Sequence, residues 1–108
     1  YNIAVVPNYN EIEEAEKLNV NVILNNNKAV DLLDLIGLIK NSSYVISNDT
    51  GPAHIAAHLN KEGLVLFGSH TTAERVSIET KNFQSIQVKN LNKLHVSSVL
   101  EKVKENLN

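Results

Sequence analysis

Short apolar runs alternate with amphipathic stretches along the whole chain. The apolar runs are rich in Val, Ile and Leu and are bounded by Asn, Gly or Pro, as strands commonly are. The uninterrupted run at 63–67 is typical of a strand that is buried on both faces of a parallel sheet. This pattern predicts strands over residues 2–6, 21–24, 44–47, 63–67 and 85–88.

The stretches between these runs carry apolar residues at helical spacing. In the clearest of them, 29–40, residues such as Leu33 and Ile36 fall on one face. Asn8 or Asn10 is the expected cap of an earlier helix, whose first turn is rich in Glu. The spacing predicts helices over residues 9–18, 29–40, 52–59 and 96–107.

Alternating strands and helices with short connections indicate an α/β fold with a Rossmann-like, doubly wound parallel sheet. A chain of 108 residues is expected to form one domain, so we assign residues 1–108 to a single domain. Ligands of such sheets bind beyond the carboxyl ends of the strands. The predicted loops at those ends are 7–10, 25–28, 48–52 and 68–72.

The turn at 48–51 offers the clearest candidate chemistry. It joins a predicted strand to a predicted helix, and we expect Gly51 at the N-cap and Pro52 at the first helical position. A helix start carries about half a positive charge and several unpaired N–H donors, which suits a phosphate or diphosphate. His54 falls in the first turn, where its ring could lean toward the same ligand.

An ordinary capped helix start is the simpler interpretation of this turn, because Asp and Thr are common capping residues. Phosphate binding is favoured by Gly51, which stands where a capping side chain would serve stability better. His54 and His58 are four residues apart and could hold a metal, but only Asp49 offers a further ligand. We therefore expect no metal site.

Composition excludes several classes of function. The net charge is −2, the sequence pI is about 6.1, and Arg75 is the single Arg, which argues against a nucleic-acid surface. The chain has no Cys, so disulfides and thiolate chemistry are excluded. No apolar run approaches the roughly 18 residues that cross a bilayer. The elbow signature of Ser/His/Asp hydrolases is also absent.

The segment 47–59, SNDTGPAHIAAHL, followed by LVLFG at 64–68, resembles glycosyltransferase family 9. This family contains the heptosyltransferases that build the inner core of lipopolysaccharide. Its pattern is roughly Asn-Asp-Ser/Thr-Gly-x-x-His-x-Ala-Ala, followed by an apolar strand that ends in Phe/Tyr-Gly. The upstream stretch at 32–42 is also similar to the helix that the family places before this motif.

The resemblance implies the C-terminal half of a GT-B glycosyltransferase, a nucleotide-sugar-binding domain that is truncated here. Asp49 would contact hydroxyls of the donor sugar, and Thr50 and Gly51 would hold the diphosphate. His54 would position or neutralise the phosphates. Further candidates for the donor site are Asn48, Pro52, Ser69 and Glu11.

The implied reaction moves a sugar from a nucleotide diphosphate donor, expected to be ADP-linked, to a lipopolysaccharide-type acceptor without another cofactor. The catalytic base and the acceptor would belong to an N-terminal domain outside this chain, so we expect the chain alone to be inactive. The family's phosphate-binding Lys, on the first strand of the domain, would also lie outside it. A cytoplasmic location, peripheral at the inner face of the bacterial inner membrane, is implied as well.

The chain departs from the family pattern in two places, and the first departure leaves the donor's identity open. After Phe67-Gly68 the family commonly has Pro-Thr, whereas this chain has Ser-His-Thr-Thr at 69–72. The first predicted strand is followed by 7–11, PNYNE, instead of a Gly-containing loop with a nearby Glu. The alternatives are a non-catalytic α/β module that binds a nucleotide or a partner, and a GT-B-type sugar epimerase, whose carboxylate set cannot be traced.

Self-association is a further expectation. If the first strand of the domain lies outside the chain, an unpaired sheet edge is exposed and can pair with a second copy. Size-exclusion chromatography that gave a clean monomer would contradict this expectation.

Overall fold

The structure is a computed structural model that describes residues 2–68 and 78–107. The predicted loop at 69–72, with the candidate Ser69, lies outside the described residues. The chain divides into two compact units, Tyr1–Gly37 and Leu38–Asn108.

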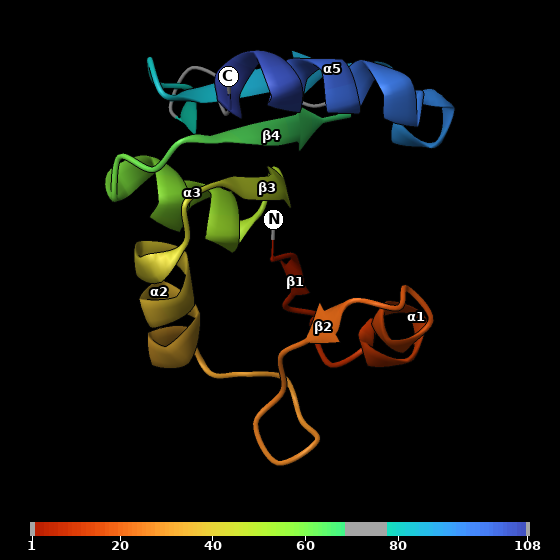
Figure 1. The fold of residues 1–108 in the computed structure, drawn as a ribbon, viewed down its shortest axis with the longest axis vertical. Coiled ribbons are helices and arrows are strands. Elements are labelled where there is room, and N and C mark those ends of the chain that lie inside the picture. Colours follow the sequence, from red (N-terminus) through yellow and green to blue (C-terminus); the bar gives the residue numbers. More distant parts are fainter. Residues whose placement is uncertain (1, 69–77, 108) are drawn as a thin grey trace. The chain divides into compact units, whose positions relative to one another are not determined.

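In the first unit, two short strands pair in parallel and a helix lies between them in the sequence. The elements, which Figure 1 labels, are β1 (Ala4–Val5), α1 (Ile12–Glu16) and β2 (Asn21–Val22). Ala4 pairs with Asn21 and Val5 with Val22, and the Ile23 N–H donates to the Val5 carbonyl at 2.9 Å. The strands lie where the apolar runs predicted them but are shorter.

The start of α1 differs from the prediction. Neither Asn8 nor Asn10 caps it; the N-cap is Glu11, whose side chain makes no capping hydrogen bond. Residues 8–11 form a turn instead, because the Glu11 N–H donates to the Asn8 carbonyl at 2.9 Å. The Glu11 carboxylate in return accepts the Asn8 N–H at 3.0 Å. This closed turn delays the helix until Ile12.

Four asparagines adopt a left-handed backbone conformation, which Asn tolerates better than most residues. They are Asn19, Asn26, Asn27 and Asn60, with φ between 51° and 63°. Asn26 and Asn27 form a two-residue hairpin tip, closed by hydrogen bonds of 2.8 and 3.0 Å between Asn25 and Lys28. Asn60 terminates a helix, so these residues shape turns and helix ends.

Helix α2 (Leu32–Asn41) begins three residues later than predicted. Asp31 sets this start, because its Oδ1 accepts the Asp34 N–H at 2.8 Å in the manner of an N-cap. Ile39 is buried, but Leu33 is 78% exposed, so the predicted apolar face was wrong at Leu33. At the other end, the Lys61 Nζ donates to the Lys40 carbonyl at 3.0 Å, a favourable place for a cation.

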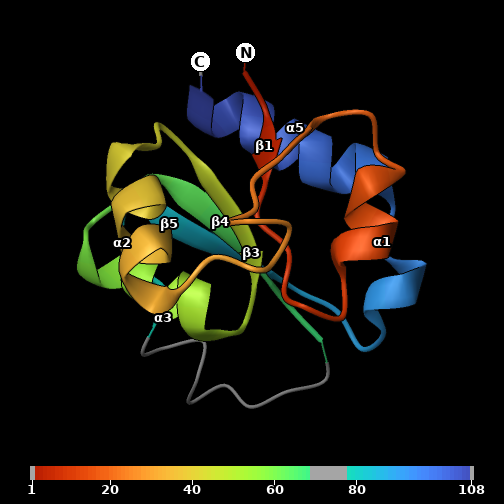
Figure 2. The same ribbon diagram turned by 90° about the horizontal axis from the view of Figure 1, so that it is seen from below.

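The second unit is a three-stranded parallel sheet with the order β3-β4-β5. Figure 2 shows α3 and α5 on opposite faces of this sheet. An α/β fold with parallel strands is thereby confirmed. The elements are β3 (Val45–Asn48), α3 (Gly51–His58), β4 (Gly63–Phe67), β5 (Phe83–Gln87), η1 (Leu91–Lys93) and α5 (Val96–Leu107).

The core of this unit is built around β4, which lies between the other two strands. Four of its five residues are buried, as the uninterrupted apolar run predicted. Phe67, Phe83 and Ile78 supply large, fully buried side chains. Helix α3 contributes only the buried methyl groups of Ala53 and Ala56, and such small side chains allow close approach to the sheet. The predicted strand at 85–88 in fact begins at Phe83, which pairs with Gly63.

The C-terminal end of α5 is fixed near the start of β3. The Asn106 Nδ2 donates to the Tyr44 hydroxyl at 2.9 Å, and Tyr44 directly precedes β3. The pKa of the Tyr44 hydroxyl is raised, mainly because the group is partly buried. The hydrogen bond from Asn106 acts to lower this pKa, and the negative charge of Glu62 acts to raise it. Helix α5 therefore runs from the carboxyl ends of the strands toward their amino ends.

Gly63 provides a test of the packing around β4. A Cβ at this position would lie 2.3 Å from the Val45 carbonyl oxygen and 2.5 Å from the Phe83 ring. We expect Gly63→Ala to lower the free energy of unfolding by about 1–3 kcal/mol, measured by urea denaturation. Gly37→Ala is the control, because a Cβ there meets nothing within 4 Å and Ala favours helix. A Gly63→Ala protein as stable as wild type would contradict this packing.

Candidate functional site

The three parallel strands of the second unit end at a common edge. Asn48 at the end of β3 pairs with Leu66, and Phe67 at the end of β4 pairs with Gln87. The turn at 48–51 and the buried Gly68 therefore follow neighbouring strands at one edge of the sheet. Parallel sheets generally bind their ligands at such an edge, so the turn lies where the sequence analysis expected a ligand.

The turn enters α3 one residue earlier than predicted. Thr50, in place of Gly51, is the N-cap, with extended backbone angles of φ −124° and ψ −175°. Gly51 is consequently the first helical residue, Pro52 the second and His54 the fourth. The Thr50 N–H donates to the Asn48 carbonyl at 2.8 Å, which closes the turn. Asn48, Thr50 and Gly51 are exposed, whereas Asp49 is half-buried.

The helix start has fewer open donors than the several that its sequence predicted. The Thr50 carbonyl accepts the N–H of Ala53 at 3.0 Å and that of His54 at 3.4 Å, and Pro52 has no N–H. Within the described residues, the Gly51 N–H is the one first-turn donor without an acceptor. The Thr50 side chain does not cap the helix, so its hydroxyl is not committed to the first-turn N–H groups.

The space next to Gly51 is open. A Cβ built on it would meet nothing within 4 Å, and its φ is not in the left-handed region. Neither packing nor backbone strain within the described residues therefore requires glycine here. Its absent side chain does allow a ligand to approach the Gly51 N–H closely.

The two histidines of α3 are both exposed. The His58 Nδ1 lies 2.8 Å from the His54 carbonyl oxygen, so this ring nitrogen is engaged by the helix backbone. In the described part of the chain, no three His, Cys, Asp or Glu side chains are grouped so that they could hold a metal ion. The imidazole of His54, in contrast, lies about one turn beyond the Thr50 cap and is exposed.

Glu11 and Ser69 are the two other sequence candidates. Glu11 belongs to the first unit, where its carboxylate accepts the Asn8 N–H. Ser69 lies outside the described residues. The first unit also has a shallow, open hollow of about 430 Å³ at the amino ends of β1 and β2, which holds no candidate residue or charged side chain; it is lined by Asn2, Ile3, Asn19, Val20 and Asn21.

One residue at the sheet edge was not among the sequence candidates. Lys89 follows β5, whose pairing with β4 continues one step beyond Gln87, since the Val88 N–H donates to the Phe67 carbonyl at 3.0 Å. Lys89 thus lies at the same edge as Asn48 and Gly68. The sequence did contain a signal for this residue, because Lys89 directly follows the predicted strand at 85–88.

A sequence profile of glycosyltransferase family 9 (heptosyltransferase) matches residues 8–104. Searches of curated proteins and of solved structures gave no match. No helix among the described residues is both long and apolar enough to span a membrane.

The uncommitted hydroxyl of Thr50 can be tested by comparing two helix caps. Asp31→Ala removes a capping hydrogen bond and should lower the free energy of unfolding by about 1 kcal/mol. Thr50→Ala removes no capping bond and should change it by less than about 0.5 kcal/mol, measured by the same urea titration. If the two variants lose equal stability, Thr50 is a structural cap.

Proposed function

The chain belongs to glycosyltransferase family 9, and on this premise we propose that it is the donor-binding part of a sugar-transferring enzyme. The observation that carries the proposal is the junction between β3 and α3. It combines an uncommitted Thr50 hydroxyl, an unpaired Gly51 N–H among the described residues, and open space beside Gly51. These features lie at the ligand-binding edge of a parallel sheet.

Each residue of the turn has a role that fits its chemistry. Thr50 and Gly51 would donate hydrogen bonds to the diphosphate, at the positive end of the α3 dipole. Asp49 would accept hydrogen bonds from the hydroxyls of the donor sugar, as carboxylates do. His54, exposed on the same end of the helix, would donate a ring N–H to a phosphate oxygen.

In the proposed reaction, the bond between the sugar's anomeric carbon and the diphosphate oxygen breaks. The electron pair leaves with the nucleoside diphosphate, while an acceptor hydroxyl oxygen bonds to the same carbon. The hydroxyl proton passes to a base that we place outside this chain. The turn at 48–51 would stabilise the leaving negative charge, and one preorganised donor of this kind contributes about 2–4 kcal/mol.

We extend the proposal to the donor, the acceptor and the architecture. The donor is an ADP-linked sugar and the acceptor a lipopolysaccharide-type saccharide, as the family resemblance implies. The chain forms the C-terminal half of a GT-B enzyme, whose other half supplies the base and the acceptor site. The parallel order β3-β4-β5, with helices on both faces, supports a doubly wound sheet of this kind.

Titration of the chain with ADP, UDP and an ADP-sugar tests the proposal, by calorimetry and by amide NMR. We expect ADP to bind, with shifts centred on Thr50, Gly51 and His54. Gly51→Val should lower the affinity at least tenfold, because its side chain fills the open space. Gly37→Val is the matched control: it is also a helical glycine with open surroundings, and it should bind ADP like the wild-type chain.

The opposite results are equally informative. If ADP and UDP fail to bind to the chain and also to the full-length protein, the donor-site assignment is wrong and the non-catalytic partner-binding module becomes the better explanation. If Gly51→Val binds ADP as tightly as the wild-type chain does, the nucleotide binds at a place other than the turn at 48–51. If the chain binds UDP more tightly than ADP, the proposed site stands, but the donor is a UDP-linked sugar and not an ADP-linked one.

A further inference from the structure

The turn at 48–51 and the two elements that it joins carry no fixed positive charge. Residues 41–60, which include β3, the turn and α3, hold neither Lys nor Arg, and Asp49 adds a negative charge. A nucleoside diphosphate brings at least two further negative charges, which increase as it leaves the sugar. One unpaired N–H and a helix start compensate only part of this charge. The following inference rests on the proposed function and asks which residue of this chain adds a cation to the Lys that the family resemblance places outside it.

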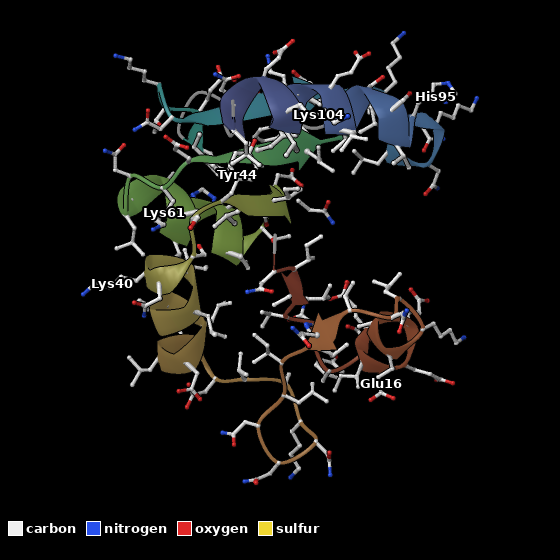
Figure 3. All side chains as sticks on the ribbon, in the orientation of Figure 1. Glu16, Lys40, Tyr44, Lys61, His95 and Lys104 are labelled. Atoms are coloured by element: carbon white, nitrogen blue, oxygen red, sulfur yellow. The ribbon has the colours of Figure 1, made fainter. Side chains whose placement is uncertain are left out.

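Most described lysines of the second unit lie away from the ligand-binding edge. Lys61 directly precedes β4 and donates to the Lys40 carbonyl, and Lys81 precedes β5 by two residues. The Asn106–Tyr44 hydrogen bond places the end of α5 near the start of β3, so Lys104 lies toward the amino ends of the strands too. Figure 3 labels Lys40, Lys61 and Tyr44 at one end of this unit and His95, which precedes α5, at the other.

Lys89 is at the correct edge. It is exposed and follows Val88, the last residue that pairs with β4. Neighbouring strands are about 4.8 Å apart, so β5 is only about 10 Å from β3. The strand between them ends in Phe67, and Gly68 follows it; both are buried. A diphosphate lying over the end of β4 would be flanked by Gly51 on one side and Lys89 on the other.

We propose that Lys89 binds the diphosphate of the donor and counters the charge that develops on it as the sugar leaves. The ammonium group acts as a point charge and donates hydrogen bonds to phosphate oxygens. Lys93 is the other lysine at this end, but it belongs to η1, beyond the turn that Asn90 caps. Lys89, in contrast, directly follows Val88, the last residue that pairs with β4.

A pair of charge-removing variants on the same strand provides the test. Lys89 stands two residues after the end of β5 and Lys81 two residues before its start, and both are exposed. Lys89→Gln should lower the affinity of the chain for ADP about fivefold, a typical effect of losing one exposed charge pair. Lys81→Gln removes the same charge at the opposite edge and should leave ADP affinity unchanged.

Ligand and salt dependence separate a phosphate contact from a general electrostatic effect. Lys89→Gln should weaken binding of ADP more than of AMP, which has one phosphate fewer. It should also reduce the salt dependence of ADP affinity, because one exposed charge pair is lost. Circular dichroism melting of both variants is expected to match wild type, since neither side chain is buried.

Four results would overturn the inference. Equal ADP affinity of Lys89→Gln and wild type, with Gly51→Val still defective, would retain the donor site and remove Lys89 from it. Equal losses in Lys81→Gln and Lys89→Gln would indicate an effect of net charge alone. A loss in Lys93→Gln without one in Lys89→Gln would transfer the role to η1. Failure of the wild-type chain, and also of the full-length protein, to bind ADP would reject the donor site and Lys89 together.

Discussion

The parallel pairing of β4 with its two neighbours is the interaction on which the second unit depends. It sets which loops share an edge, because the register fixes Asn48 beside Leu66 and Phe67 beside Gln87. The pairing is tight at its start, where Gly63 leaves no room for a Cβ between the Val45 carbonyl and the Phe83 ring. The same register that brings Gly63 against Val45 and Phe83 at the amino end brings Asn48 and Phe67 to one edge at the carboxyl end.

The polar groups at the amino ends of this sheet and those of the turn at 48–51 are used differently. At the amino ends, polar side chains hold elements together: Asn106 bonds to Tyr44, and Lys61 bonds to the end of α2. At the carboxyl ends, the Thr50 side chain makes no capping bond and Gly51 keeps an unpaired N–H within the described residues. A helix start without a side-chain cap forgoes about 1 kcal/mol of stability, which is the pattern expected where a ligand completes the site.

The sequence was sufficient to predict the elements that carry strong apolar patterns. The strand at 63–67, the helix at 96–107 and the strand–turn–helix order around 48–51 were all predicted correctly. Element starts were less predictable, because they depend on single local hydrogen bonds. The bond from Asp34 to Asp31 delays α2, and the closed turn at Asn8–Glu11 delays α1. The exposure of Leu33 also could not be predicted, because helical spacing shows which residues share a helix face but not which elements pack against that face.

The candidate site shows the same division between pattern and detail. The motif at 48–54 could be located from sequence, since Asn, Asp, Thr, Gly and Pro mark a turn before a helix. The number of unpaired N–H donors could not be predicted from the sequence. It depends on the position of the N-cap, which is Thr50 and not Gly51, and on the Thr50 carbonyl, which accepts two N–H groups. With one donor left, the helix start alone would be a weak diphosphate site. The contribution that we propose for Lys89 could not be predicted from the motif, because it depends on the register that places the end of β5 at the same edge.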